Sequence, residues 1–324
     1  MQNNIKTIGI IGGGQLGMMM TEAAHQLGYK VIVLDPTPHC PCGQIAEEQI
    51  VAAYDDDEKV CELCQKSDVI TYEFENVPYT SVKELKEQYN IPQGEIPLYI
   101  SQHRLREKSA ASKAGAHCGD YYAVSSTRKL MKAISILGYP SVLKTCSGGY
   151  DGKGQIVLYD PTQLPAASDM AERAECILEK FIPFDCEISV IVTRSITGEM
   201  TVLPITQNIH KENILYMSIA PAPINKIVLE KAETMAREIM LNLDFVGTLA
   251  VEMFVVGEEV YFNEMAPRPH NSGHYSIEGS TTSQFEQHIR AITGMPLGKT
   301  DLLQPTIMVN YLGQHVNGIA ELQK

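Results

Sequence analysis

The sequence predicts a multidomain protein of mixed α/β and α+β class. Strand-like and helix-like segments alternate over residues 5–90, as in βαβ units on a parallel sheet. A Pro- and Gly-containing stretch ends near residue 97, and an antiparallel hairpin pattern follows much later, at residues 247–267. A chain of 324 residues is too long for one ordinary core. We predict domains at residues 1–97 and 98–295, with residues 296–324 beginning a C-terminal domain.

Composition narrows the class of protein. The net charge of -13 and the pI near 5.2 argue against non-specific nucleic-acid binding, which needs a basic surface. The N-terminus runs into a strand without an apolar signal region, and no segment is long enough to span a membrane, so we expect a cytoplasmic protein. The eight cysteines are expected to be small buried side chains rather than disulfide or zinc ligands.

The first domain is predicted from four strand-like runs, at residues 6–12, 30–35, 49–54 and 68–74. The first run leads into Gly12-Gly13-Gly14-Gln15-Leu16-Gly17, which matches the G-x-G-x-x-G pattern of a Rossmann-like turn. Asp35 ends the next run, where a dinucleotide-binding domain places an acidic residue. Taken alone, this segment predicts a dinucleotide site.

The second domain is predicted to be α+β. Strand-like runs flank a Gly-rich turn, two further runs read as a pair, and amphipathic helices separate these from the hairpin and from a last strand. In order, the elements are strands at 139–147 and 154–160, a helix at 165–174, paired strands at 176–182 and 186–194, a helix at 226–241, the hairpin, a helix at 280–294 and a strand at 305–313.

The hairpin carries the most informative pair of residues. If its turn is centred on Glu258, then Glu252 and Glu264 lie directly opposite each other. Like charges at that spacing repel, and a magnesium ion would compensate them. The alternative is two solvated carboxylates on an exposed hairpin. We favour the metal site because Phe254 and Phe262 are expected on the same face.

A glycine-rich loop at residues 147–154 predicts a phosphate site. Its glycines let the backbone approach a phosphate closely, and Lys153 adds a cation. Lys144, at the end of the preceding strand, would neutralise a further phosphate. Without Lys144, a plain Gly-rich hairpin turn would explain the loop equally well.

Two further runs suit a nucleotide and an anionic substrate. The run Glu179–Ile182 ends beside Pro183, where free backbone groups can meet the edge of a base, and Glu187 can accept ribose hydroxyls. This signal is weak alone. Residues 266–274 gather Arg268, His270 and Asn271 next to Glu264, an arrangement suited to an anion whose charge moves during a reaction.

Together these segments resemble the carboxyaminoimidazole ribonucleotide synthetases, over about residues 6–315. The resemblance rests on IGIIGGGQLG, TYEFENVP, LKT with GGYDGKGQ, QNIH, GTLAVEM, NEMAPRPHNSGHY and SQFEQHIRAI, which occur in the family's order and at similar spacing. It implies a Rossmann-like domain followed by an ATP-grasp domain, in which ATP lies between two α+β lobes. It also implies an ATP-dependent ligase of purine biosynthesis, and a homodimer.

The resemblance also implies roles for single residues. Magnesium would lie between the ATP phosphates and the pair Glu252 and Glu264. The nucleotide would be held by Arg104, Lys144, Gly149, Tyr150, Asp151, Gly152, Lys153, Gly154, Gln155, Glu179, Lys180, Phe181, Ile182, Glu187, His210, Asn263 and Glu264. The ribonucleotide would meet Gln15, Leu16, Glu73, Tyr150, Asp151 and Arg268, and bicarbonate would face Arg268, His270 and Asn271.

The implied reaction starts with bicarbonate attacking the γ-phosphate of ATP to give carboxyphosphate, a step that needs charge neutralisation. The exocyclic amine of aminoimidazole ribonucleotide is then carboxylated, with Asp151 expected to orient or deprotonate it. Members of the family usually continue into a segment with a lysine and an arginine that reach the ribonucleotide. We therefore expect a shortened C-terminal part, and a chain that binds ADP and magnesium but carboxylates poorly.

Three other functions stay open at the level of sequence. The Gly12–Gly17 turn with Asp35 fits a nicotinamide-dependent oxidoreductase, although hydride transfer requires neither the phosphate loop nor the paired glutamates. Another ATP-grasp ligase, such as a biotin carboxylase, would share the nucleotide site. A nucleotide-binding protein without turnover is the third.

Overall fold

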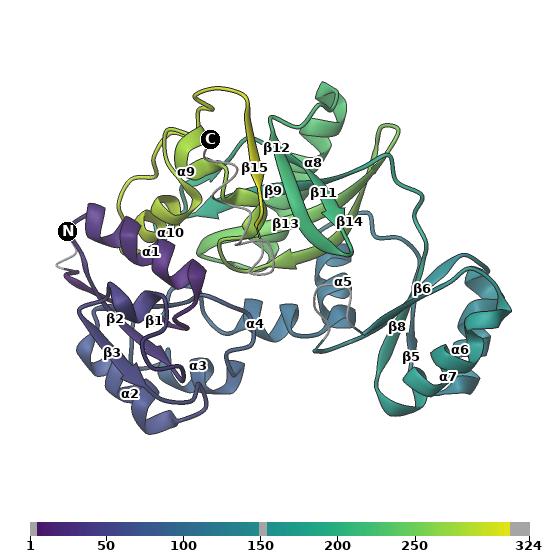
Figure 1. Cartoon of the computed structure of the whole chain (residues 1–324), viewed down its shortest axis with the longest axis horizontal. Coiled ribbons are helices and arrows are strands. Elements are labelled where there is room, and N and C mark those ends of the chain that lie inside the picture. The colour runs from purple at the N-terminus through teal and green to yellow at the C-terminus, as the bar shows by residue number, and fades with distance from the viewer. Residues whose placement is uncertain (1–4, 149–153, 312–324) are drawn as a thin grey trace.

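The computed structural model describes residues 5–148 and 154–311. In these residues the strands form three sheets, one in the N-terminal domain and two in the rest of the chain (Figure 1). The N-terminal domain and the small four-stranded sheet lie at opposite ends of the molecule, and the large sheet lies between them. No helix of the described ranges is long and apolar enough to cross a membrane.

The N-terminal sheet is parallel, in the order β3-β2-β1-β4. This confirms the four strands expected from the alternating pattern. The strands are β1 (Thr7–Ile11), β2 (Lys30–Asp35), β3 (Glu48–Val51) and β4 (Val69–Tyr72), and the helices are α1 (Gln15–Gln26), α2 (Asp57–Lys66), α3 (Tyr79–Leu85) and α4 (Ile96–Ser101).

The large sheet has the order β14-β13-β9-β11-β12-β15, with the short β10 paired to β9. Helix α8 packs on β9, β13 and β14, and its buried face shares one apolar core with these strands. The strands are β9 (Cys186–Arg194), β10 (Met200–Val202), β11 (Thr206–Lys211), β12 (Ile214–Ala220), β13 (Gly247–Val256), β14 (Glu259–Ala266) and β15 (Thr306–Val309); the helices are α5 (Arg104–Lys113), α8 (Lys226–Asn242), α9 (Ser276–Gly279) and α10 (Gln284–Thr293).

The small sheet has the order β5-β8-β6-β7 and is covered by two helices. Its elements are β5 (Tyr121–Val124), α6 (Thr127–Leu137), β6 (Ser141–Thr145), β7 (Gln155–Leu158), α7 (Leu164–Arg173) and β8 (Cys176–Lys180). The expected pairing of runs 176–182 and 186–194 is wrong. The break around Pro183 carries the chain from β8 in the small sheet to β9 in the large one, where Asp185 N–H already bonds Val255 C=O at 2.8 Å.

The glycine-rich turn before α1 is occupied by the protein's own carboxylates. Glu73, which is buried just after β4, accepts hydrogen bonds from the N–H groups of Gly14 at 2.6 Å and Gly17 at 2.5 Å. Asp35 accepts from Gly13 N–H at 2.8 Å. A dinucleotide would need these amides for its pyrophosphate. The turn therefore fixes the position of Glu73, and the oxidoreductase interpretation loses its main support.

We expect no binding of a nicotinamide dinucleotide. Because Glu73 already fills the first turn of α1, millimolar NAD should leave the unfolding temperature unchanged, whereas ADP with magnesium should raise it. A thermal-shift series with both ligands measures this. A shift with NAD as large as that with ADP would restore the oxidoreductase interpretation.

Candidate active site

A cavity of about 840 Å³ is lined by residues of the small sheet, the large sheet and α5. It brings together most of the side chains expected from the sequence. Lining it are Arg104, Lys144, Gln155, Glu179, Lys180, Phe181, Ile182, Glu187, His210, Glu252, Asn263, Glu264, Arg268, His270 and Asn271. Gln15, Leu16 and Glu73 lie on the N-terminal domain, outside this lining; Gly154, directly before β7, also lies outside it. Gly149, Tyr150, Asp151, Gly152 and Lys153 lie outside the described residues.

Glu252 on β13 and Glu264 on β14 are direct cross-strand partners, as the sequence predicted. The reason differs from the expected one. The hairpin turns at Gly257 and Glu258, and a bulge then leaves Asn263 without a partner, which moves Glu264 into register with Glu252. The two-residue turn already pairs Phe262 with Met253, and both lie in the apolar core, so the expectation that Phe254 and Phe262 share one face is wrong.

The two carboxylates are held in different states. Burial, and then the charge of Glu264, raises the pKa of Glu252 to about 8, so its proton is retained at neutral pH. For Glu264, burial acts in the same direction, but Arg104 and Lys144 outweigh it and lower the pKa. Arg104 Nη1 donates to Glu264 Oε2 at 3.0 Å. Only 15% of the Glu252 side chain is exposed, against 42% for Glu264, and both line the cavity, so the alternative of two solvated carboxylates is disfavoured for Glu252 and stays open for Glu264.

The oxygen atoms here fit a magnesium ion. Asn263 directly precedes Glu264 on β14, and its buried Oδ1 has no hydrogen-bond partner. Magnesium takes one or two carboxylates and completes its shell with phosphate oxygens and water. In the described ranges no three or more His, Cys, Asp or Glu residues gather as a metal site.

A buried ion network joins the small sheet to the edge of the large one. Glu179 on β8 pairs with Lys108 at 2.9 Å and with Lys144 at 2.6 Å. Burial opposes its ionisation, yet these two ammonium groups hold the pKa of Glu179 well below its usual range. Lys108 also donates to Phe262 C=O at 3.2 Å, beside the bulge. The network fixes Lys144, the expected phosphate ligand, at the cavity wall.

A second ion pair and an aromatic pair line other parts of the wall. His210 pairs with Glu187; burial opposes protonation, but the carboxylate of Glu187 raises the pKa of His210. The rings of Phe184 and Phe254 stack with their centroids 4.6 Å apart. The apolar rings and the nearby main chain of Lys180–Ile182 suit a planar base, whereas the ion pair suits hydroxyl groups.

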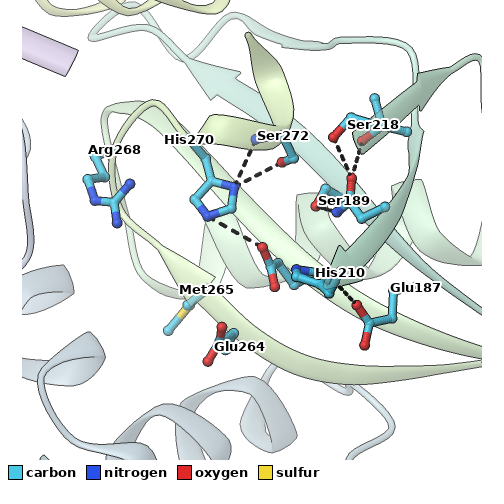
Figure 2. Close-up of polar contacts among 12 residues, drawn as sticks. Glu187, Ser189, His210, Ser218, Glu264, Met265, Arg268, His270 and Ser272 are labelled. Atoms are coloured by element: carbon cyan, nitrogen blue, oxygen red, sulfur yellow. Dashed lines mark hydrogen bonds and ion pairs between the residues drawn. The ribbon is translucent and has the colours of Figure 1, made fainter. Parts of the chain in front are cut away.

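The loop after β14 presents a cation and a neutral imidazole (Figure 2). Arg268 Nε donates to Glu75 Oε2 at 2.5 Å and Nη2 to Oε1 at 3.2 Å. His270 Nε2 lies 3.4 Å from Glu252 Oε1, and its Nδ1 lies 2.9 Å from Ser272 Oγ. Burial, and then the charge of Arg268, lowers the pKa of His270 to about 3, so the ring is neutral at pH 7.

Sequence reasoning missed Glu75, Glu107 and Lys108, which also line the cavity. The last two could have been found, since Arg104, Glu107 and Lys108 recur at the i, i+3, i+4 spacing of one helical face. Glu107 Oε1 accepts from Met265 N–H at 2.6 Å, so it holds the edge strand on the far side of the bulge from Lys108. Only the tertiary fold brings Glu75 to Arg268.

Glu107 predicts a pH dependence of stability. Burial, and then the charge of Glu264, raises the pKa of Glu107 from its ordinary 4.5 to about 8 in the folded protein. The folded chain therefore retains a proton that the unfolded chain releases near pH 4.5. This contribution to stability is full below pH 4.5 and is lost as the pH rises to about 8.

In Glu107→Gln the acceptor for Met265 N–H remains but the titration is removed. The fall in unfolding free energy between pH 5 and pH 8 should therefore be smaller in the variant than in the unaltered protein. Urea unfolding at a series of pH values measures the two slopes, and equal slopes would contradict the assignment.

Comparison with known proteins agrees with this architecture. A family model described as the ribonucleotide synthetase preATP-grasp domain matches residues 5–102, and one described as the ATP-grasp domain matches residues 109–285. These matches confirm the expected order of a Rossmann-like domain and an ATP-grasp domain, while the boundaries at 97 and 295 stay predictions.

Relatives of known structure or curated name cover nearly the whole chain. N5-carboxyaminoimidazole ribonucleotide synthase of Bacillus subtilis is 50% identical over 97% of this chain and 83% of its own length. The Staphylococcus aureus N5-carboxyaminoimidazole synthetase complexed with ADP has a TM-score of 0.95 and 43% identity, covering 100% of this chain and 86% of that one.

A third structure, from Aspergillus clavatus, is described as a complex with ADP and 5-aminoimidazole ribonucleotide. It has a TM-score of 0.93 and 28% identity, covering 100% of this chain and 88% of that one. With the domain order, the cavity and the paired glutamates, these likenesses confirm the resemblance found in the sequence. The chain is an ATP-dependent ligase and belongs to the N5-carboxyaminoimidazole ribonucleotide synthase family of ATP-grasp proteins.

Proposed function

We propose that this protein carboxylates the exocyclic amine of aminoimidazole ribonucleotide with bicarbonate, coupled to cleavage of ATP to ADP and phosphate. The main support is that the Glu252–Glu264 pair lines the same cavity as Arg268 and His270. The glutamate pair suits magnesium and ATP phosphates, whereas Arg268 and His270 suit a small anion. The relative crystallised with ADP and the ribonucleotide supports the choice of substrates.

The nucleotide would lie between the small sheet and the hairpin. Its base would meet the main chain of Lys180–Ile182 and the Phe184–Phe254 pair, and its ribose the Glu187–His210 pair. Its phosphates would point toward Lys144 and Arg104. Glu252, Glu264 and Asn263 would hold magnesium, which when bound neutralises charge on the phosphates and aligns the γ-phosphate for attack.

In the first step an oxygen of bicarbonate attacks the γ-phosphorus, the bond to the bridging oxygen breaks, and ADP leaves, giving carboxyphosphate. The planar guanidinium of Arg268 matches two oxygens of bicarbonate, and the neutral His270 orients it by a hydrogen bond without adding charge. Arg104 and Lys144 stabilise the negative charge that moves onto the leaving phosphate.

In the second step the amine attacks the carboxyl carbon, directly or as carbon dioxide released beside it, and phosphate leaves. One proton must leave the amine, and Asp151 is our candidate to accept it. Carboxyphosphate decomposes in water, so the bound substrates would have to exclude water from the cavity during the reaction. Gln15, Leu16, Glu73 and Tyr150 are our candidates for holding the ribonucleotide, with Arg268 shared between the two substrates.

The test is transfer of labelled carbon. With ATP, magnesium, ¹³C-bicarbonate and the ribonucleotide, carbon NMR should show a new carbamate signal that depends on all four. A protein that cleaves ATP with bicarbonate but leaves the ribonucleotide unlabelled would point instead to another carboxylating ATP-grasp ligase.

A further inference from the structure

Gln284, the first residue of α10, bonds both main-chain groups of His270. The N–H of His270 donates to Gln284 Oε1 at 2.9 Å, and Gln284 Nε2 donates to the C=O of His270 at 2.7 Å. Gln284 Nε2 also lies 3.2 Å from Nδ1 of His274. The side chain is fully buried, with an exposed fraction of 0%. A single amide therefore fixes the peptide groups on both sides of the His270 Cα.

The ring of His270 is fixed by different partners. Its Nδ1 contacts Ser272, as Figure 2 shows, and its Nε2 faces Glu252 at 3.4 Å. With main chain and ring both held, the imidazole has one position on the cavity wall. The position of the His270 Cα determines where its imidazole lies. If the Gln284 side chain moved, the His270 main chain would move with it, and the ring would be displaced relative to Glu252.

Neighbouring residues leave space for the Gln284 side chain and bond its main chain. A Cβ at Gly273 would collide with the Gln284 amide, so the glycine makes room for it. Ser276 Oγ accepts from the main-chain N–H of Gln284 at 3.0 Å and donates to Gly273 C=O at 2.5 Å. The loop and the start of α10 thus form one hydrogen-bonded unit.

Helix α10 is itself immobilised from two other sides. Phe285, Ile289 and Ile292 pack into the core of the N-terminal domain, and α10 lies beside α1 (Figure 1). His288 Nε2 lies 2.8 Å from Thr71 Oγ1 on β4, and its Nδ1 accepts from Thr248 N–H at 3.1 Å on β13. The helix joins the N-terminal domain, the large sheet and the loop that carries His270.

We propose that Gln284 is a positioning residue: its amide holds the His270 main chain so that the imidazole faces Glu252 in the cavity. The inference rests on the proposed function, in which His270 orients bicarbonate. It goes further by assigning the geometry of His270 to a buried residue that contacts no substrate, on a helix anchored in the other domain.

The chain contains a matched control on the same helix. Gln287 is equally buried, and its amide makes the same two-sided bond to a main chain, from Nε2 to Gly298 C=O at 2.6 Å and from Gly298 N–H to Oε1 at 3.0 Å. Gly298 is not part of the cavity lining. Replacing either glutamine by methionine removes one such pair of bonds with little change in shape, so both variants should lose similar stability.

The experiment compares Gln284→Met with Gln287→Met in three measurements: ADP affinity by calorimetry, the ring ¹⁵N signals of His270, and ADP release with bicarbonate. The His270 signals are assigned by their absence in His270→Asn. We expect ADP affinity within about twofold in both variants, because the adenine and ribose contacts lie elsewhere. Only Gln284→Met should shift the His270 signals and lower ADP release, by about 10- to 100-fold.

Equal effects of the two variants on the His270 signals would overturn the inference. If Gln284→Met does not fold, the same measurements are made on Gln284→Glu and Gln287→Glu. Glutamate keeps the Oε1 acceptor and the shape of the side chain but loses the Nε2 donor. Only Gln284→Glu should then shift the His270 signals and lower ADP release. If the unaltered protein releases no ADP with bicarbonate, the proposed function is wrong. The positioning role of Gln284 is still tested by comparing the His270 signals of the two variants.

Discussion

Glu264→Gln should lower ATP cleavage by about 100- to 1,000-fold while the protein stays folded. The substitution keeps the size of the side chain and an oxygen that can accept from Arg104, but removes the one carboxylate of the pair that is charged at neutral pH. Removing the charge of Glu264 also removes one cause of the raised pKa of Glu252, but burial, the larger cause, remains and still opposes ionisation of Glu252.

The matched control is Glu259→Gln, on the same strand but at the surface, where the carboxylate pairs with Lys231 at 2.7 Å. It should retain full activity. Steady-state release of ADP from both variants, with unfolding temperatures as a check on the fold, measures the difference. Normal ATP cleavage by Glu264→Gln would remove Glu264 from the metal site.

Arg268→Lys should lower bicarbonate-dependent ADP release by about 100-fold and leave ADP affinity unchanged. Lysine keeps the positive charge but not the planar fork that binds two oxygens at once, and it cannot reproduce both bonds to Glu75. The loss should appear in kcat more than in the KM for ATP, because Arg268 lies beside the expected anion rather than beside the adenine.

Arg194→Lys serves as the control, because Arg194 is similarly covered, with 19% of its side chain exposed against 15% for Arg268, and also pairs with a carboxylate. Its partner Asp244 lies outside the cavity lining. Initial rates of ADP release at several bicarbonate concentrations are compared between Arg268→Lys and Arg194→Lys, and only Arg268→Lys should be slow. Equal rates for both variants would show that Arg268 serves only to hold Glu75.

Local pattern was enough to predict much of the fold. The four strands of the N-terminal sheet, the hairpin and the last strand all follow from periodicity and turn residues, which are properties of short segments. The pairing of β8 with β9 could not be judged in this way. Both runs read as strands, and only packing decides that the chain crosses from one sheet to the other at Pro183.

The candidate site likewise combines features that the sequence predicts with features that only the tertiary fold determines. Glu252 and Glu264 were correctly paired, although the sequence revealed neither the bulge at Asn263 nor the two-residue turn that pairs Phe262 with Met253 in the core. The Gly12–Gly17 turn predicted a dinucleotide because nothing local reveals that Glu73, far along the chain, fills it. The partners of Glu179 likewise come from tertiary contacts, which periodicity does not report.

Release of ADP by the unaltered protein is the most direct test of the proposed activity. It should be measured with ATP and magnesium alone, then with bicarbonate, with the ribonucleotide, and with both. The cavity predicts ADP release that depends on bicarbonate and rises further when the ribonucleotide is added. Release that is the same with and without bicarbonate, or none in any mixture, would contradict the account.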